Sequence, residues 1–155
     1  MLKVSGFYDS SCTNGDGWRS VIFFTGCPHK CKGCLNPETW DFDGGEFYSP
    51  LDLLQKIKNN IDHIDGVTFS GGEPFQERYV DDLLILINEI KKLNLNIWCY
   101  TGYLYEELLK NSKYSSILKN IDVLVDGPFI REKYDPQLKF RGSSNQRVLF
   151  LNKKT

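Results

Sequence analysis

Three of the five cysteines lie in one short segment, Cys27-Pro28-His29-Lys30-Cys31-Lys32-Gly33-Cys34. Thiolates at these spacings can converge on one metal centre, and soft sulfur ligands select zinc, copper(I) or an iron–sulfur cluster. A structural zinc site has four protein ligands, so zinc would need His29 as well. Without His29, three cysteines would leave one iron of a four-iron cluster open to bind a second molecule. The chemistry favours an iron–sulfur cluster, with a zinc site as the alternative, over unrelated surface thiols.

A second motif, Gly71-Gly72-Glu73-Pro74, directly follows a predicted strand. Two glycines permit a close approach of the backbone to a ligand and unusual backbone angles, and Glu73 offers an acceptor to a cationic group. The spacing matches neither the dinucleotide-binding fingerprint nor the phosphate-binding loop. Because Gly-Gly turns are mostly structural, the motif becomes informative only together with the cysteine segment upstream.

The elements that must position these motifs alternate along the chain. Runs of β-branched and aromatic residues predict strands, and apolar residues at helical spacing predict helices. The predicted strands cover residues 19–25, 66–70, 97–101, 121–125 and 146–150, and the predicted helices cover 50–61, 77–93 and 105–118, the last with a potential break at 111–112. Such alternation predicts parallel strands with crossover helices.

The length limits how these units can be arranged. A closed eight-unit barrel needs at least about 200 residues, and the chain has 155. We therefore expect one α/β domain over residues 1–155, built as a partial, open (β/α) barrel or a curved, mostly parallel sheet.

In such sheets, ligands bind at the carboxyl ends of the strands. The cysteine segment, the Gly71–Pro74 motif, Tyr100-Thr101-Gly102 and Asp126-Gly127-Pro128 each follow a predicted strand. We therefore expect these four segments to meet at one rim. The sequence leaves two alternatives open for each of two residues. Asp126 faces the site or caps a turn, and Trp40 shields the metal centre or faces a partner.

Composition excludes several classes of protein. Lys and Arg number 19 against 20 Asp and Glu, a net charge of −1, which argues against a nucleic-acid-binding protein. The longest apolar run, Leu83–Ile87, is too short to cross a membrane, and the first residues have no apolar signal core. We expect a cytoplasmic protein with no membrane partner, in which Cys12 and Cys99 are spectator thiols.

Taken together, Cys27-x₃-Cys31-x₂-Cys34 and Gly71-Gly72-Glu73-Pro74 resemble the two signatures of the radical S-adenosylmethionine enzymes. The resemblance implies a [4Fe–4S] cluster bound by the three cysteines. It also implies that the amino and carboxylate groups of S-adenosyl-L-methionine bind the open iron. Gly71, Gly72 and Glu73 would then contact the methionyl ammonium.

Within that superfamily, the chain is most similar to the family of activating proteins of anaerobic ribonucleoside-triphosphate reductases. The similar stretches are residues 25–34, 36–40, 70–74, 98–103, 123–129 and 141–146. Gly33 stands where the wider superfamily often has an aromatic residue near the adenine, and this family resembles the chain in having glycine. The backbone of Gly33, Cys34 and Leu35 is therefore the expected adenine contact.

The family resemblance implies a reaction and its partners. One electron from the cluster would cleave S-adenosylmethionine to methionine and a 5′-deoxyadenosyl radical, which would take hydrogen from a glycine of the large reductase subunit. A low-potential donor such as flavodoxin or ferredoxin would supply the electron, and no side chain is expected to be catalytic itself. The alternatives are a radical enzyme that acts on a small molecule, similar to 7-carboxy-7-deazaguanine synthase, and a non-catalytic interaction module held by zinc.

Overall fold

The computed structural model describes residues 1–34 and 37–152, so the expected adenine contact at Leu35 lies outside the described residues. The strands are β1 (Leu2–Ser11), β2 (Arg19–Phe24), β3 (Glu46–Tyr48), β4 (Gly66–Gly71), β5 (Asn96–Tyr100), β6 (Val123–Asp126) and β7 (Arg147–Phe150). The α-helices are α1 (Pro50–Lys58), α2 (Val80–Lys92), α3 (Tyr105–Leu109) and α4 (Ser112–Leu118). Short 3₁₀ turns occupy Pro37–Thr39, Ile61–His63, Glu77–Tyr79 and Arg131–Lys133.

All seven strands form one open sheet in the order β3-β1-β2-β4-β5-β6-β7. The central four, β2, β4, β5 and β6, run parallel, while β1, β3 and β7 pair antiparallel at the two edges. This arrangement confirms the predicted curved, mostly parallel and open α/β fold. Parallel pairing matters for the site because it brings the carboxyl ends of all four central strands to the same edge.

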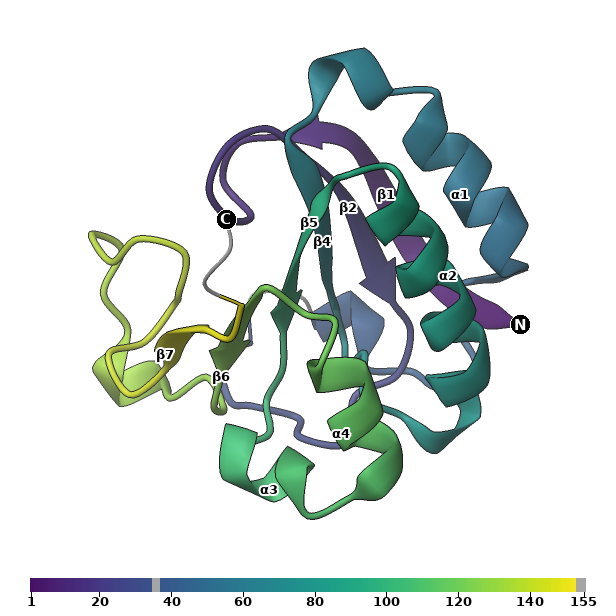
Figure 1. Ribbon diagram of the computed structural model, residues 1–155. Coiled ribbons are helices and arrows are strands. Elements are labelled where there is room, and N and C mark those ends of the chain that lie inside the picture. Colours follow the sequence, from purple (N-terminus) through teal and green to yellow (C-terminus); the bar gives the residue numbers. More distant parts are fainter. Residues whose placement is uncertain (35–36, 153–155) are drawn as a thin grey trace.

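Two separate apolar layers stabilise the sheet. Alternate strand residues, such as Ile22 of β2 and Phe69 of β4, pack with the apolar faces of the four helices in the main core. A smaller cluster of Trp98, Val123 and Val125 lies on β5 and β6, with Phe140 packed against it. Figure 1 shows α1 and α2 on one side of the sheet and the 128–146 segment on the other. The helices therefore cover one face, and an irregular segment covers part of the opposite one.

Among the described residues, no helix is both long enough and apolar enough to cross a membrane.

Candidate functional site

A cavity of about 400 Å³ opens at the carboxyl ends of the parallel strands. The four segments expected at one rim all contribute to its lining: Cys27, Cys31 and Cys34 after β2, Ser70–Gly72 at the end of β4, Tyr100–Gly102 at the end of β5, and Gly127 after β6. The predicted convergence at one rim is therefore confirmed. A cavity of this size falls within the range of small-molecule sites.

The cysteine segment is held against the Gly-Gly turn by backbone hydrogen bonds. Gly72 N–H donates to the carbonyl of Phe24 at 2.9 Å, and Glu73 N–H donates to that of Gly26 at 2.8 Å. A Cβ on Gly72 would collide with the Gly26 carbonyl oxygen, so this position requires glycine. On its other side, Cys27 N–H donates to the carbonyl of Trp40 at 3.3 Å. The first cysteine is thus positioned by contacts on both sides.

The surroundings of the thiols suit a positively charged centre. Burial raises the pKa of Cys27, while the backbone N–H groups of His29 and Lys30 lower it by stabilising the thiolate. Burial likewise raises the pKa of Cys31, and the N–H of Phe129 opposes that effect. Backbone N–H groups thus oppose the effect of burial on both thiols. A bound metal cluster would add positive charge that stabilises the thiolates further.

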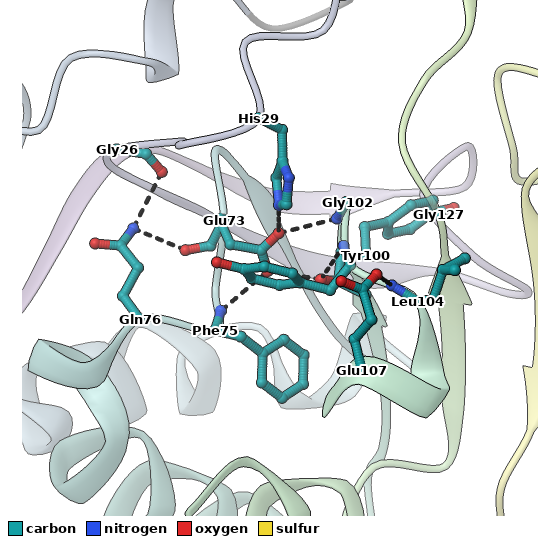
Figure 2. Close-up of polar contacts among 12 residues, drawn as sticks. Gly26, His29, Glu73, Phe75, Gln76, Tyr100, Gly102, Leu104, Glu107 and Gly127 are labelled. Carbon is teal, nitrogen blue, oxygen red and sulfur yellow. Dashed lines mark hydrogen bonds and ion pairs between the residues drawn. The ribbon is translucent and has the colours of Figure 1, made fainter. Parts of the chain in front are cut away.

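Glu73 lies beneath the cavity and connects three segments of the rim (Figure 2). Its Oε1 accepts from His29 Nε2 at 2.6 Å and from the Gly102 N–H at 2.9 Å. Its Oε2 accepts from Thr101 Oγ1 at 2.7 Å and from the Phe75 N–H at 3.1 Å. The side chain is fully buried, and all four partners belong to the chain itself. Glu73 therefore shapes the site from below, whereas Gly71 and Gly72 line the cavity.

His29 lines the cavity together with the three cysteines, and two neighbours hold its ring in place. Its ring packs edge-on against Tyr103, with centroids 4.5 Å apart, and bonds Glu73 through Nε2. Among the described residues, no three His, Cys, Asp or Glu side chains are placed to hold one metal ion. The cysteines of a four-iron cluster bind different irons, so their sulfurs need not approach a single ion. The arrangement disfavours the three-cysteine, one-histidine zinc site that the sequence left open.

Gly33 packs under the segment that follows β6. Its φ is +76°, and a Cβ there would lie 2.9 Å from Cδ of Arg131, so glycine both adopts the backbone conformation and leaves room for that side chain. Gly33 is not among the residues that line the cavity, whereas Cys34 is. Of the two expected adenine contacts that the structure describes, Gly33 and Cys34, only Cys34 lines the cavity.

The far wall of the cavity is built by the 128–146 segment, which ends in Arg141-Gly142-Ser143-Ser144-Asn145-Gln146. Gln146 Oε1 accepts from the N–H groups of Gly142 at 2.9 Å and Ser143 at 3.1 Å, and its Nε2 donates to the carbonyl of Gly127 at 3.0 Å. Asn145 adds a bond to the carbonyl of Pro128 at 2.8 Å. The similarity over residues 141–146 thus falls on a loop that is fastened to the end of β6.

Asp126 does not line the cavity. Its Oδ2 accepts from the Tyr105 N–H at 2.8 Å at the start of α3, and Arg147 pairs with both of its oxygens. Asp126 therefore holds the start of α3 and is not part of the cavity lining.

Three aromatic residues that line the cavity were not predicted from the sequence to belong to the site: Phe129, Tyr134 and Phe140. These residues belong to a stretch without helical or strand periodicity. Their only signal is the density of aromatic residues between two short strands, which does not specify where they point.

The chain is similar to known proteins over most of its length. Residues 13–149 match the family model described as a 4Fe-4S single cluster domain. The anaerobic ribonucleoside-triphosphate reductase-activating protein of Haemophilus influenzae is 37% identical over 145 residues, which cover 90% of this chain and 92% of the relative. This chain belongs to the family of anaerobic ribonucleoside-triphosphate reductase-activating proteins.

Other relatives in this family have similar coverage. The protein of the same name from Escherichia coli K12 is 36% identical over 95% of this chain and 97% of its own length. The one from enterobacteria phage T4 is 34% identical over 95% and 93%, respectively. The similarity therefore extends from the cysteine segment to the wall formed by the 128–146 segment.

Proposed function

We propose that the chain activates an anaerobic ribonucleoside-triphosphate reductase by forming a glycyl radical on its large subunit, with a [4Fe–4S] cluster and S-adenosyl-L-methionine. The observation that carries the proposal is the joining of three cysteines and the Gly71-Gly72 turn at one cavity. The names of the relatives support the target, and the matching family model supports the cluster.

The residues present fit the cluster. Cys27, Cys31 and Cys34 would hold it, and backbone N–H groups already point at the first two sulfurs. His29 Nε2 is hydrogen-bonded to Glu73, and among the described residues His29 is not grouped with other side chains that could hold one metal ion. One iron is then left for the amino and carboxylate groups of the second cofactor, which is the open position that a reactive metal centre needs.

The residues present also fit a nucleoside-sized ligand. Gly71 and Gly72 expose backbone groups to the cavity, and aromatic side chains line much of the rest. When bound, the cluster and S-adenosylmethionine would supply the one-electron reductive chemistry that a glycyl radical on the partner requires. The electron would come from a low-potential protein such as flavodoxin or ferredoxin.

The chain's own residues hold the walls of the cavity in position and shield the group that would bind there. Glu73 holds the cysteine segment and the end of β5 in one relative position through His29, Thr101 and Gly102. Gln146 fastens the opposite wall to the end of β6. These contacts order the cavity before a ligand enters, which limits the entropy lost on binding.

The decisive experiment is anaerobic reconstitution with iron and sulfide, followed by metal analysis and electron paramagnetic resonance with the large reductase subunit. We expect about four irons and four sulfides per chain, cleavage of S-adenosylmethionine on reduction, and a glycyl signal on the partner. Cys31→Ala should lose the cluster and the cleavage activity, because two thiolates cannot hold it. Cys12→Ala, which alters an exposed thiol, is the matched control.

Each contrary result points elsewhere. Zinc without sulfide would contradict the cluster and favour an interaction module. Cofactor cleavage without a glycyl signal would contradict the proposed target and favour a small-molecule substrate.

A further inference from the structure

Trp40 carries a buried hydrogen-bond donor that no described residue satisfies. Its indole Nε1 is shielded from solvent, yet it has no hydrogen-bond partner among the described residues. The same residue is among those that line the cavity with the three cysteines. An indole N–H can only donate, so it needs an acceptor. Buried polar groups without partners are rare because the lost hydration is not replaced, and each one calls for an explanation.

The backbone of Trp40 is fixed beside the first cysteine. Its carbonyl accepts from the Cys27 N–H at 3.3 Å, and its own N–H donates to the carbonyl of Pro37 at 3.2 Å. The neighbouring Thr39 carbonyl accepts from Gly26 at 2.7 Å. The indole therefore lies at the cavity wall on a backbone that is hydrogen-bonded to the cysteine segment.

The other unsatisfied buried side-chain atom of the described residues is of a different kind. Asn145 Oδ1 lacks a partner, but Asn145 is not among the residues that line the cavity, and its Nδ2 already donates to Pro128. Only Trp40 combines an unsatisfied buried atom with a place in the cavity wall.

We propose that the Trp40 indole N–H donates a hydrogen bond to an acceptor atom of the group that fills this cavity. The inference rests on the proposed function, which supplies two sources of that acceptor: a sulfur atom of the cluster, or an oxygen or nitrogen of S-adenosylmethionine. On this proposal Trp40 is a binding residue at the metal centre and its ligand rather than a contact for a partner.

The test is Trp40→Phe, which removes the N–H and keeps an aromatic ring, with Trp18→Phe as the matched control because Trp18 is 52% exposed. Two quantities are measured after anaerobic reconstitution: the reduction potential of the cluster without S-adenosylmethionine, and the dissociation constant of S-adenosylmethionine. The loss of one hydrogen bond corresponds to about a fivefold change in an equilibrium constant.

The two sources give different results. If the indole donates to sulfur, the variant loses stabilisation of the reduced cluster, and its potential falls by about 40 mV, the one-electron equivalent of fivefold. If the indole donates to S-adenosylmethionine, the dissociation constant rises about fivefold and the potential without the ligand stays unchanged. If neither quantity differs from the Trp18→Phe control, the proposal is overturned.

A measurement on the unaltered side chain covers the case in which Trp40→Phe does not fold. The ultraviolet resonance Raman bands of the indole N–H groups are recorded for the Trp18→Phe protein, which retains Trp40 and Trp98, before and after loading with cluster and S-adenosylmethionine. Trp98 does not line the cavity, so only the Trp40 contribution should change on loading. A shift to stronger hydrogen bonding supports the proposal, and an unmoved band overturns it. Loading itself is checked by iron content and ligand binding, so a failure of the proposed function is visible separately.

Discussion

Two side chains fasten opposite walls of the cavity in the same way but in different surroundings. Glu73 is fully buried, and its carboxylate accepts four hydrogen bonds from the cysteine segment, the turn that follows Glu73 and the end of β5. Gln146 is partly exposed, and its neutral amide makes three bonds, two within the final loop and one to the carbonyl of Gly127 after β6. When a buried acceptor is removed, its donors find neither another acceptor nor water. In a partly exposed network, water can replace the lost partner. The wall that Glu73 fastens, which includes the cysteine segment, should therefore be the more rigid of the two. Substitutions there should lower the free energy of unfolding more.

The largest effect is expected for Glu73→Ala. Four donors around Glu73 would lose their acceptor in a buried place, and we expect the free energy of unfolding to fall by about 4 kcal/mol. Urea denaturation measures the change. Glu132→Ala removes an exposed carboxylate and should stay within about 0.5 kcal/mol of the parent. Equal stability of the two variants would contradict the central role of Glu73.

Gly102→Ala tests the same wall without removing a polar group. A Cβ at Gly102 would collide with the imidazole ring of His29, so the ring must leave Glu73 or the backbone must move. We expect a loss of about 1–3 kcal/mol and weaker retention of iron after reconstitution. Gly6→Ala is the matched control, because its Cβ would meet nothing closer than 3.7 Å. Unchanged stability and iron retention would mean that His29 is not held there.

The smallest effect is expected for Gln146→Ala. Its partners can be partly hydrated, so the loss should be about 1–2 kcal/mol, with faster hydrogen exchange at the amides of Gly142 and Ser143. Gln137→Ala, in an exposed position of the same segment, should leave that exchange unchanged. If Gln146→Ala destabilises the protein more than Glu73→Ala, the difference drawn between the two walls is wrong.

Helix boundaries followed from local chemistry. Ser49 caps α1 by accepting from the Asp52 N–H, and Asn111 interrupts the third predicted helix by accepting from the N–H groups of Lys113 and Tyr114. The predicted helix from Glu77 begins instead with a 3₁₀ turn before α2. Side-chain caps act over two or three residues, which is why they are visible in the sequence.

The edge strands were harder to predict. β1 was missed because Gly6 and several polar residues disrupt the alternation typical of a strand, and β3 has only three residues. Their conformation is stabilised by pairing: β1 is hydrogen-bonded to β2 on one side and to β3 on the other. Such partners are distant in sequence, so no local pattern reports them.

The sequence by itself determined which residues can take part in chemistry and at which edge of the sheet they meet. The spacing of the three cysteines, the Gly-Gly turn and the apolar strands before them are local features, and parallel strands necessarily bring their ends together. Only the tertiary structure decided that Glu73 lies buried beneath the cavity, that His29 bonds it, and that Trp40, a residue of the cavity wall, has a buried indole N–H without a partner among the described residues. These outcomes depend on which side chains from distant segments exclude water from one another, and that is a property of packing in three dimensions.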